Sequence, residues 1–130
     1  MYHFWKGYGS NNSLALGRHS SNDKWMLASM IGGSYVYLYT GTATLNEYCH
    51  LVYTYDGSTI SVYQDNISLG TNSSSSGSAD WSGGLKIGWW SAGGDYDFNG
   101  DIPVMKFYDR ALTASEVASN FKAYKQRFNI

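Results

Sequence analysis

Apolar and polar residues alternate along much of this 130-residue chain, a pattern that predicts β-strands. The alternation is clear in residues 48–55, 59–64 and 67–71. Asp56-Gly57 joins the first two of these runs, and Asp65-Asn66 joins the second and third. Because these residue types tolerate a positive φ, each pair predicts a tight turn between neighbouring strands. The three runs together predict an antiparallel meander.

Further alternating runs extend the predicted strands over most of the chain. They cover residues 2–6, 13–17, 25–31, 35–39, 85–90 and 102–108. Seven or more short strands can bury their faces by packing one sheet on another, so the chain is expected to be an all-β, antiparallel β-sandwich. The polar segment TNSSSSGS, residues 71–78, is too short to separate domains, which predicts a single domain over residues 1–130.

The periodicity changes near the C-terminus, where it predicts one short α-helix. Thr113 and Glu116 match a capping box, in which each side chain binds the backbone amide of the other residue. Apolar residues then recur at spacings of four, three and four, at Val117, Phe121, Tyr124 and Phe128. The helix is therefore expected to dock on the sheet through this stripe.

The charge composition excludes several classes of function. Ten acidic residues balance nine basic ones, and only Lys122, Lys125 and Arg127 form a basic cluster, so nucleic-acid binding is not expected. A single cysteine, Cys49, excludes an internal disulfide and a multi-cysteine zinc site. Residues 25–46 carry no charge, but they are rich in glycine, serine and threonine. Since that composition resists a membrane-spanning helix, membrane insertion is not expected either.

Two segments resemble laminin-G-like members of the concanavalin A-like lectin/glucanase superfamily. The first, HLVYTYDGSTISVYQDN (residues 50–66), resembles two strands of that family and the Tyr-Asp-Gly turn between them. The second comprises LKIGW (85–89), FNGDI (98–102) and VMKFYDRALTASEV (104–117), and it resembles the closing strand and the start of the helix. The resemblance implies a concanavalin A-like sandwich, or jelly roll, with a short C-terminal helix.

The resemblance also implies which side chains of the closing strand are buried. It places Met105 and Phe107 in the core and turns Lys106 and Tyr108 outward. Family members usually begin with one or two strands before the one that residues 4–6 resemble. Either the chain is part of a longer protein that supplies these strands, or a neighbouring subunit covers the sheet edge.

The C-terminal residues 108–128 are also similar to the ends of tail and surface proteins of bacteriophages. This resemblance implies a location on a virion surface or in another extracellular assembly. The expected partners are then cell-surface glycans or other virion subunits, and a homo-oligomer is one arrangement that fits.

Catalysis is not expected from this chain. Glycosidases of the superfamily carry clustered glutamates, and glycoside hydrolysis normally needs a pair of carboxyl groups across the scissile bond. The chain has two glutamates, Glu47 and Glu116, which are far apart in sequence, and Glu116 belongs to the capping box. Cys49 stands where the family has a tryptophan, which implies a buried residue rather than a reactive thiol.

Residues 95–100 match the first six positions of a calcium-binding loop, and Asp101 follows them. The candidate ligands are Asp97, Asn99 and Asp101, and laminin-G-like relatives often carry calcium at the rim of the sandwich. Lys106, however, stands where the closing glutamate of such a loop should be. Entry into the following strand, without a metal, explains the same residues.

Surplus aromatic residues are the strongest candidates for binding. Tyr35, Tyr37 and Tyr39 share one face of a strand whose other face supplies the core, and Trp89 and Trp90 point to opposite sides of theirs. Aromatic rings can stack on sugars or fill protein interfaces, although packing alone also explains them. The chain is therefore expected to be a non-catalytic binding or adhesion module. The alternatives are a purely structural virion protein that binds no sugar and, less favoured, a glycosidase-related domain.

Overall fold

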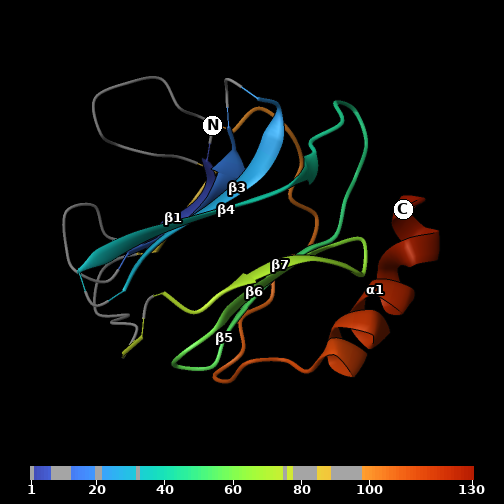
Figure 1. The fold of residues 1–130 in the computed structure, drawn as a ribbon. Helices are drawn as coiled ribbons and strands as arrows, with labels where there is room; N and C mark the ends of the chain where they lie inside the picture. The colour runs from blue at the N-terminus through green and yellow to red at the C-terminus, as the bar shows by residue number, and fades with distance from the viewer. Residues whose placement is uncertain are drawn as a thin grey trace.

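The computed structural model describes residues 2–6, 13–19, 22–31, 33–74, 76–77, 85–88 and 98–130. Within them, eight strands form two antiparallel sheets, and one helix follows (Figure 1). The five-stranded sheet has the order β4-β3-β2-β1-β8, with bounds β4 (Ser34–Thr42), β3 (Lys24–Ile31), β2 (Ser13–Arg18), β1 (Tyr2–Lys6) and β8 (Leu85–Ile87). The three-stranded sheet has the order β5-β6-β7, with bounds β5 (Leu51–Tyr55), β6 (Ile60–Gln64) and β7 (Ile67–Asn72). The sandwich and the meander predicted from the sequence are both confirmed.

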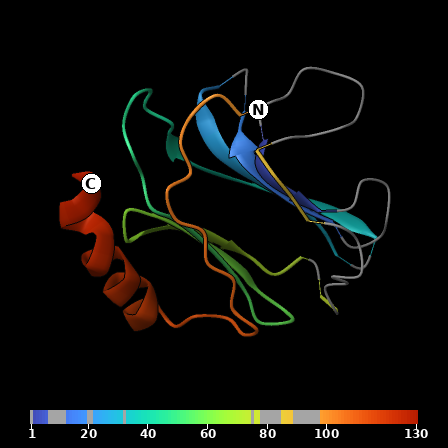
Figure 2. The ribbon, with the colours of Figure 1, turned by 180° about the vertical axis from the view of Figure 1, so that it is seen from behind.

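The core lies between the two sheets, which face each other in both views of the ribbon (Figures 1 and 2). Leu27 and Val36 come from the five-stranded sheet, and Ile60 and Val62 come from the three-stranded sheet. All four are at most 3% exposed. Because strand side chains alternate between faces, burying Val36 leaves its neighbours on β4 on the outer face.

The tight turns of the meander follow from residues that accept a left-handed backbone. Asp65 and Asn66 have φ of 50° and 67°, as a two-residue hairpin turn requires, and they join β6 to β7. Gly57 has φ of 97° between β5 and β6. There the Asp56 carboxylate accepts hydrogen bonds from the backbone amides of Ser58 and Thr59 at 2.9 and 2.7 Å. Both predicted turns are confirmed.

The helix α1 (Ala114–Phe128) begins at the predicted capping box. The Thr113 side chain accepts from the Glu116 amide at 3.3 Å, and the Glu116 carboxylate accepts from the Thr113 amide at 2.9 Å. Val117 is fully buried, and the Phe121 ring lies 5.9 Å from that of His50, just before β5. In the described part of the chain, no helix has the length and apolar character needed to cross a membrane.

Residues 102–108, which we name the crossing segment, do not form the predicted strand. Figure 2 shows this segment crossing from the level of the five-stranded sheet towards α1, and it belongs to neither sheet. The segment contains the chain's single proline, Pro103, which has no N–H to offer a neighbouring strand. Without ladder pairing, the alternation of side chains no longer fixes which face is buried. Phe107, expected in the core, is 56% exposed, whereas Met105 is half-buried.

Candidate functional site

Three tyrosines on the outer face of β4, Tyr35, Tyr37 and Tyr39, form an exposed group that we name the tyrosine row. They are 53%, 51% and 42% exposed, whereas Val36 between the first two is 3% exposed. The rings of Tyr35 and Tyr37 lie 6.0 Å apart with planes only 11° from parallel. Tyr39 makes an edge contact of 5.5 Å with the ring of His19. The sequence pattern therefore predicted the outward direction of these side chains correctly.

The position of the tyrosine row in the sheet matters for binding. β4 is the edge strand of the described five-stranded sheet, so the row is reached from the side as well as from above. A tyrosine side chain has only two rotatable bonds, which limits the side-chain entropy lost when a partner binds. A row of this kind suits either the apolar face of a sugar ring or another protein surface.

The other residues proposed from the sequence are only partly described. Trp89, Trp90 and Asp97 lie outside the described residues. Asn99 and Asp101 are exposed, and the Asp101 carboxylate accepts a long hydrogen bond of 3.5 Å from the Tyr48 hydroxyl. Among the described residues, no three histidine, cysteine, aspartate or glutamate side chains gather where they could hold a metal ion. Calcium binding therefore stays a prediction.

Glu116 is committed to the helix start and to an ion pair. The Arg110 guanidinium donates to both carboxylate oxygens of Glu116, at 2.8 and 2.5 Å. These bonds and the cap bonds from Thr113 lower the pKa of Glu116 to about 2. A general acid for glycoside hydrolysis needs a carboxyl group whose pKa is raised, so Glu116 is unsuited to that role.

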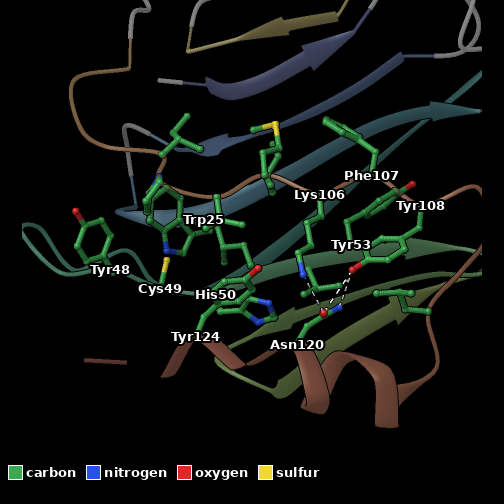
Figure 3. Close-up of a pocket in the computed structure, with 18 of the residues that line it drawn as sticks. Trp25, Tyr48, Cys49, His50, Tyr53, Lys106, Phe107, Tyr108, Asn120 and Tyr124 are labelled. Atoms are coloured by element: carbon green, nitrogen blue, oxygen red, sulfur yellow. Dashed lines mark hydrogen bonds between the residues drawn. The ribbon is translucent and has the colours of Figure 1, made fainter. Parts of the chain in front are cut away.

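A cavity of about 880 Å³, which the sequence did not predict, lies between β5, the crossing segment and α1 (Figure 3). Much of its wall is apolar or aromatic. These lining residues include Trp25, Leu27, Tyr48, Tyr53, Tyr124 and Phe128. Figure 3 shows Tyr48 and Cys49 on one side, with Lys106, Tyr108 and Asn120 on the other. The tyrosine row does not line this cavity, so the two features are separate.

The cavity wall near α1 carries a small polar cluster, which consists of Lys106, Tyr108 and Asn120. The Asn120 amide nitrogen donates to the Tyr108 hydroxyl at 3.1 Å, and the Lys106 ammonium donates to the Asn120 carbonyl oxygen at 3.4 Å. Lys106 also lies 4.9 Å from the centre of the Tyr124 ring. Contact with Tyr124 raises the pKa of Lys106 above its ordinary value, so this side chain is cationic at neutral pH.

Cys49 and His50 line the same cavity in forms that carry no charge at neutral pH. Burial raises the pKa of Cys49 to about 12, and the nearby charge of Asp65 acts in the same direction. Burial also lowers the pKa of His50, and within the described structure its buried Nδ1 atom has no hydrogen-bond partner. Because a thiol with so high a pKa is a poor nucleophile, the expectation of an unreactive Cys49 agrees with this geometry.

The sequence could not indicate this cavity because its walls come from distant segments. Residues 48–50, 106–108 and 120–124 meet only when the crossing segment and α1 have folded beside β5. In the sequence alone, His50 and Tyr124 look like ordinary packing residues of a strand and a helix.

The arrangement of two antiparallel sheets with a C-terminal helix defines a sandwich of the lectin type. A family model described as "Concanavalin A-like lectin/glucanases superfamily", of the laminin G type, matches residues 2–118. The chain therefore belongs to this superfamily, as its motifs suggested.

Comparisons with individual proteins add little to the family assignment. No curated protein matches the chain. Among solved structures, a similar one is an S-layer domain-containing protein (residues 221–444) from Clostridium thermocellum ATCC 27405, with 26% sequence identity and a TM-score of 0.49. The match covers 88% of this chain and 59% of that one. The superfamily assignment fits a binding or structural module.

Proposed function

We propose that this chain is a non-catalytic binding module of an extracellular assembly, such as a virion surface, and that it contacts glycans through the tyrosine row. The observation that carries the proposal is the half-exposed, nearly parallel pair of Tyr35 and Tyr37 on an edge strand. Rigid, exposed aromatic rings offer a sugar an apolar surface at low entropic cost. Membership of a lectin-containing superfamily supports the same reading.

The chemistry of the glutamates supports a role without catalysis. A retaining or inverting glycosidase needs one carboxyl group that stays protonated and a second that acts as nucleophile or base. Glu116 is ionised and held by Arg110, and Glu47 is the other glutamate of the chain. A binding module needs no such pair.

A second candidate function is a purely structural one, in which the tyrosine row is a contact between subunits. This candidate is favoured by the position of the row on β4, because an edge strand has backbone groups that a neighbouring chain can pair with. Tyrosine is also enriched in protein interfaces. In this case the chain would assemble with copies of itself or with other virion subunits, and it would bind no sugar.

A glycan array combined with light scattering separates the two candidates. Tyr37→Ser removes the central ring of the row, and Tyr37→Phe, the matched control, keeps it. If the glycan proposal is correct, the serine variant binds array glycans about threefold to tenfold more weakly, and the phenylalanine variant binds nearly as well as the parent. Unchanged glycan binding by a folded serine variant would discard the proposal. An oligomer that binds no glycan and dissociates on Tyr37→Ser would establish the structural role.

A further inference from the structure

We propose that the cavity between β5, the crossing segment and α1 is a second ligand site, which takes a saccharide carrying one carboxylate, of the uronic acid class. The site is separate from the tyrosine row, and it does not depend on whether that row binds glycans. Its volume of about 880 Å³ lies within the range of small-molecule sites and exceeds that of a single sugar ring.

The walls of the cavity suit the faces of a sugar ring. Tyr48 and Tyr124 line it, together with the largely buried Trp25 (8% exposed), and Figure 3 labels all three. Tyr48 is 44% exposed, and its ring lies 5.2 Å from that of Phe128 on α1. This contact ties one side of the cavity to the helix. Aromatic walls of this kind bury the C–H faces of a sugar and leave its hydroxyl groups for polar contacts.

Lys106 is the feature that indicates a carboxylate. No described carboxylate lies within ion-pair distance of its ammonium, in contrast to Arg110, which is engaged with Glu116. The hydrogen bond from Lys106 to the Asn120 carbonyl oxygen is long, at 3.4 Å. A ligand carboxylate could form a shorter, charge-assisted bond at the same position. The Asn120 amide and the Tyr108 hydroxyl stand beside it, ready to bind ring hydroxyls.

The remaining charges of the cavity limit the ligand to one carboxylate. Glu47, Asp101 and Asp109 also line it, together with Arg110, whose charge is paired with Glu116. Asp101 accepts a hydrogen bond from the Tyr48 hydroxyl, and Figure 3 shows Tyr48 on the side of the cavity away from Lys106. Carboxylates accept hydrogen bonds from sugar hydroxyl groups but repel a second anionic group on the ligand. A single uronic acid unit fits the charges at both ends of the cavity, because its carboxylate binds Lys106 and its hydroxyl groups are directed towards Asp101.

Calorimetric titration of the full chain with methyl β-D-glucuronide tests the proposal. The neutral methyl ester of the same glycoside is the matched ligand, and butyrate is a monocarboxylate without a sugar ring. Lys106→Met removes the charge and keeps most of the length of the side chain. Lys122→Met is the matched control on the exposed side of α1, since Lys122 does not line the cavity. Melting curves verify that every variant folds.

We expect the glucuronide to bind, and its ester and butyrate to bind at least about threefold more weakly. Lys106→Met should reduce glucuronide affinity by about threefold to tenfold, whereas Lys122→Met and Tyr37→Ser should leave it unchanged. The proposal is overturned by an absence of glucuronide binding at millimolar concentration, or by equal affinity for the acid and its ester. It is also overturned if butyrate binds as tightly as the glucuronide, or if a folded Lys106→Met variant binds like the parent. None of these outcomes bears on the tyrosine row, which the Tyr37→Ser array experiment tests.

Discussion

Replacement of Val117 by alanine tests how α1 is held against the sandwich. Val117 is fully buried, while the rest of the apolar stripe on the helix is only half-buried. The substitution removes two methyl groups from a site without solvent, which costs about 1.6 kcal/mol of transfer free energy. The space left behind adds roughly 1 kcal/mol, because a packed surrounding collapses only in part. Alanine has a better helix propensity than valine, which offsets about 0.5 kcal/mol of this loss in stability.

The net expectation is that Val117→Ala lowers the free energy of unfolding by about 2 kcal/mol. Urea unfolding followed by tryptophan fluorescence and by circular dichroism measures this change. The dependence on urea concentration should stay the same, because the surface exposed on unfolding hardly changes. Both probes should report one transition if α1 unfolds together with the sheets.

Ser119→Ala is the matched control on the same helix. Ser119 is exposed, and its hydroxyl donates to the Ser115 carbonyl oxygen at 2.9 Å rather than to another element. Its replacement should raise stability by a few tenths of a kcal/mol, through helix propensity alone. A Val117→Ala variant that loses less than about 0.5 kcal/mol would refute the reasoning, since a large-to-small change in a packed core costs more. It would mean that the helix is not packed as described.

Two further predictions concern ionisation. Burial raises the pKa of Cys49 from 9.0 to about 12. Ellman's reagent at pH 8 should therefore label the folded chain at least about a hundredfold more slowly than the urea-unfolded chain. Equal labelling rates would show that the thiol is not buried. The pKa of Glu116 is lowered from 4.5 to about 2 by Arg110 and the Thr113 cap, so its contribution to stability is present above about pH 4.5 and is lost as the pH falls towards 2. The midpoint of urea unfolding should therefore fall over this range by less in Glu116→Gln than in the parent chain, and identical pH profiles would contradict the cap geometry.

The parts of the fold that could be predicted from the sequence are those set by local chemistry. Asp65-Asn66 determines a hairpin because these two residues adopt the left-handed backbone more readily than most others. The capping box at Thr113 determines where α1 begins for the same kind of reason, since its two side chains satisfy amides only a few residues away. The outward tyrosine row follows from the period of two in a strand with one buried face.

The candidate site was predictable only in part because it combines local and distant contributions. The tyrosine row lies on one strand, so its direction away from the core followed from alternation alone. The polar cluster joins Lys106 and Tyr108 to Asn120, more than ten residues further along the chain. Sequence spacing carries no information on such a contact until the direction of the crossing segment is known. The hydrogen-bonded polar cluster of Lys106, Tyr108 and Asn120 was therefore the part of the candidate sites that could not be predicted from the sequence.

The absence of the strand predicted at residues 102–108 and the presence of the cavity have a single cause, which is that this segment pairs with no neighbouring strand. A strand paired with β5 would lie about 4.8 Å from it, and at that spacing side chains would fill the gap. No backbone hydrogen bond of the described structure joins residues 99–112 to β5, and the cavity of about 880 Å³ lies between them. Phe107 is exposed for the same reason, because without a partner strand no ladder directs it inward. The departure from the predicted sheet thus leaves Lys106 at an open cavity wall, where its charge is accessible to a ligand.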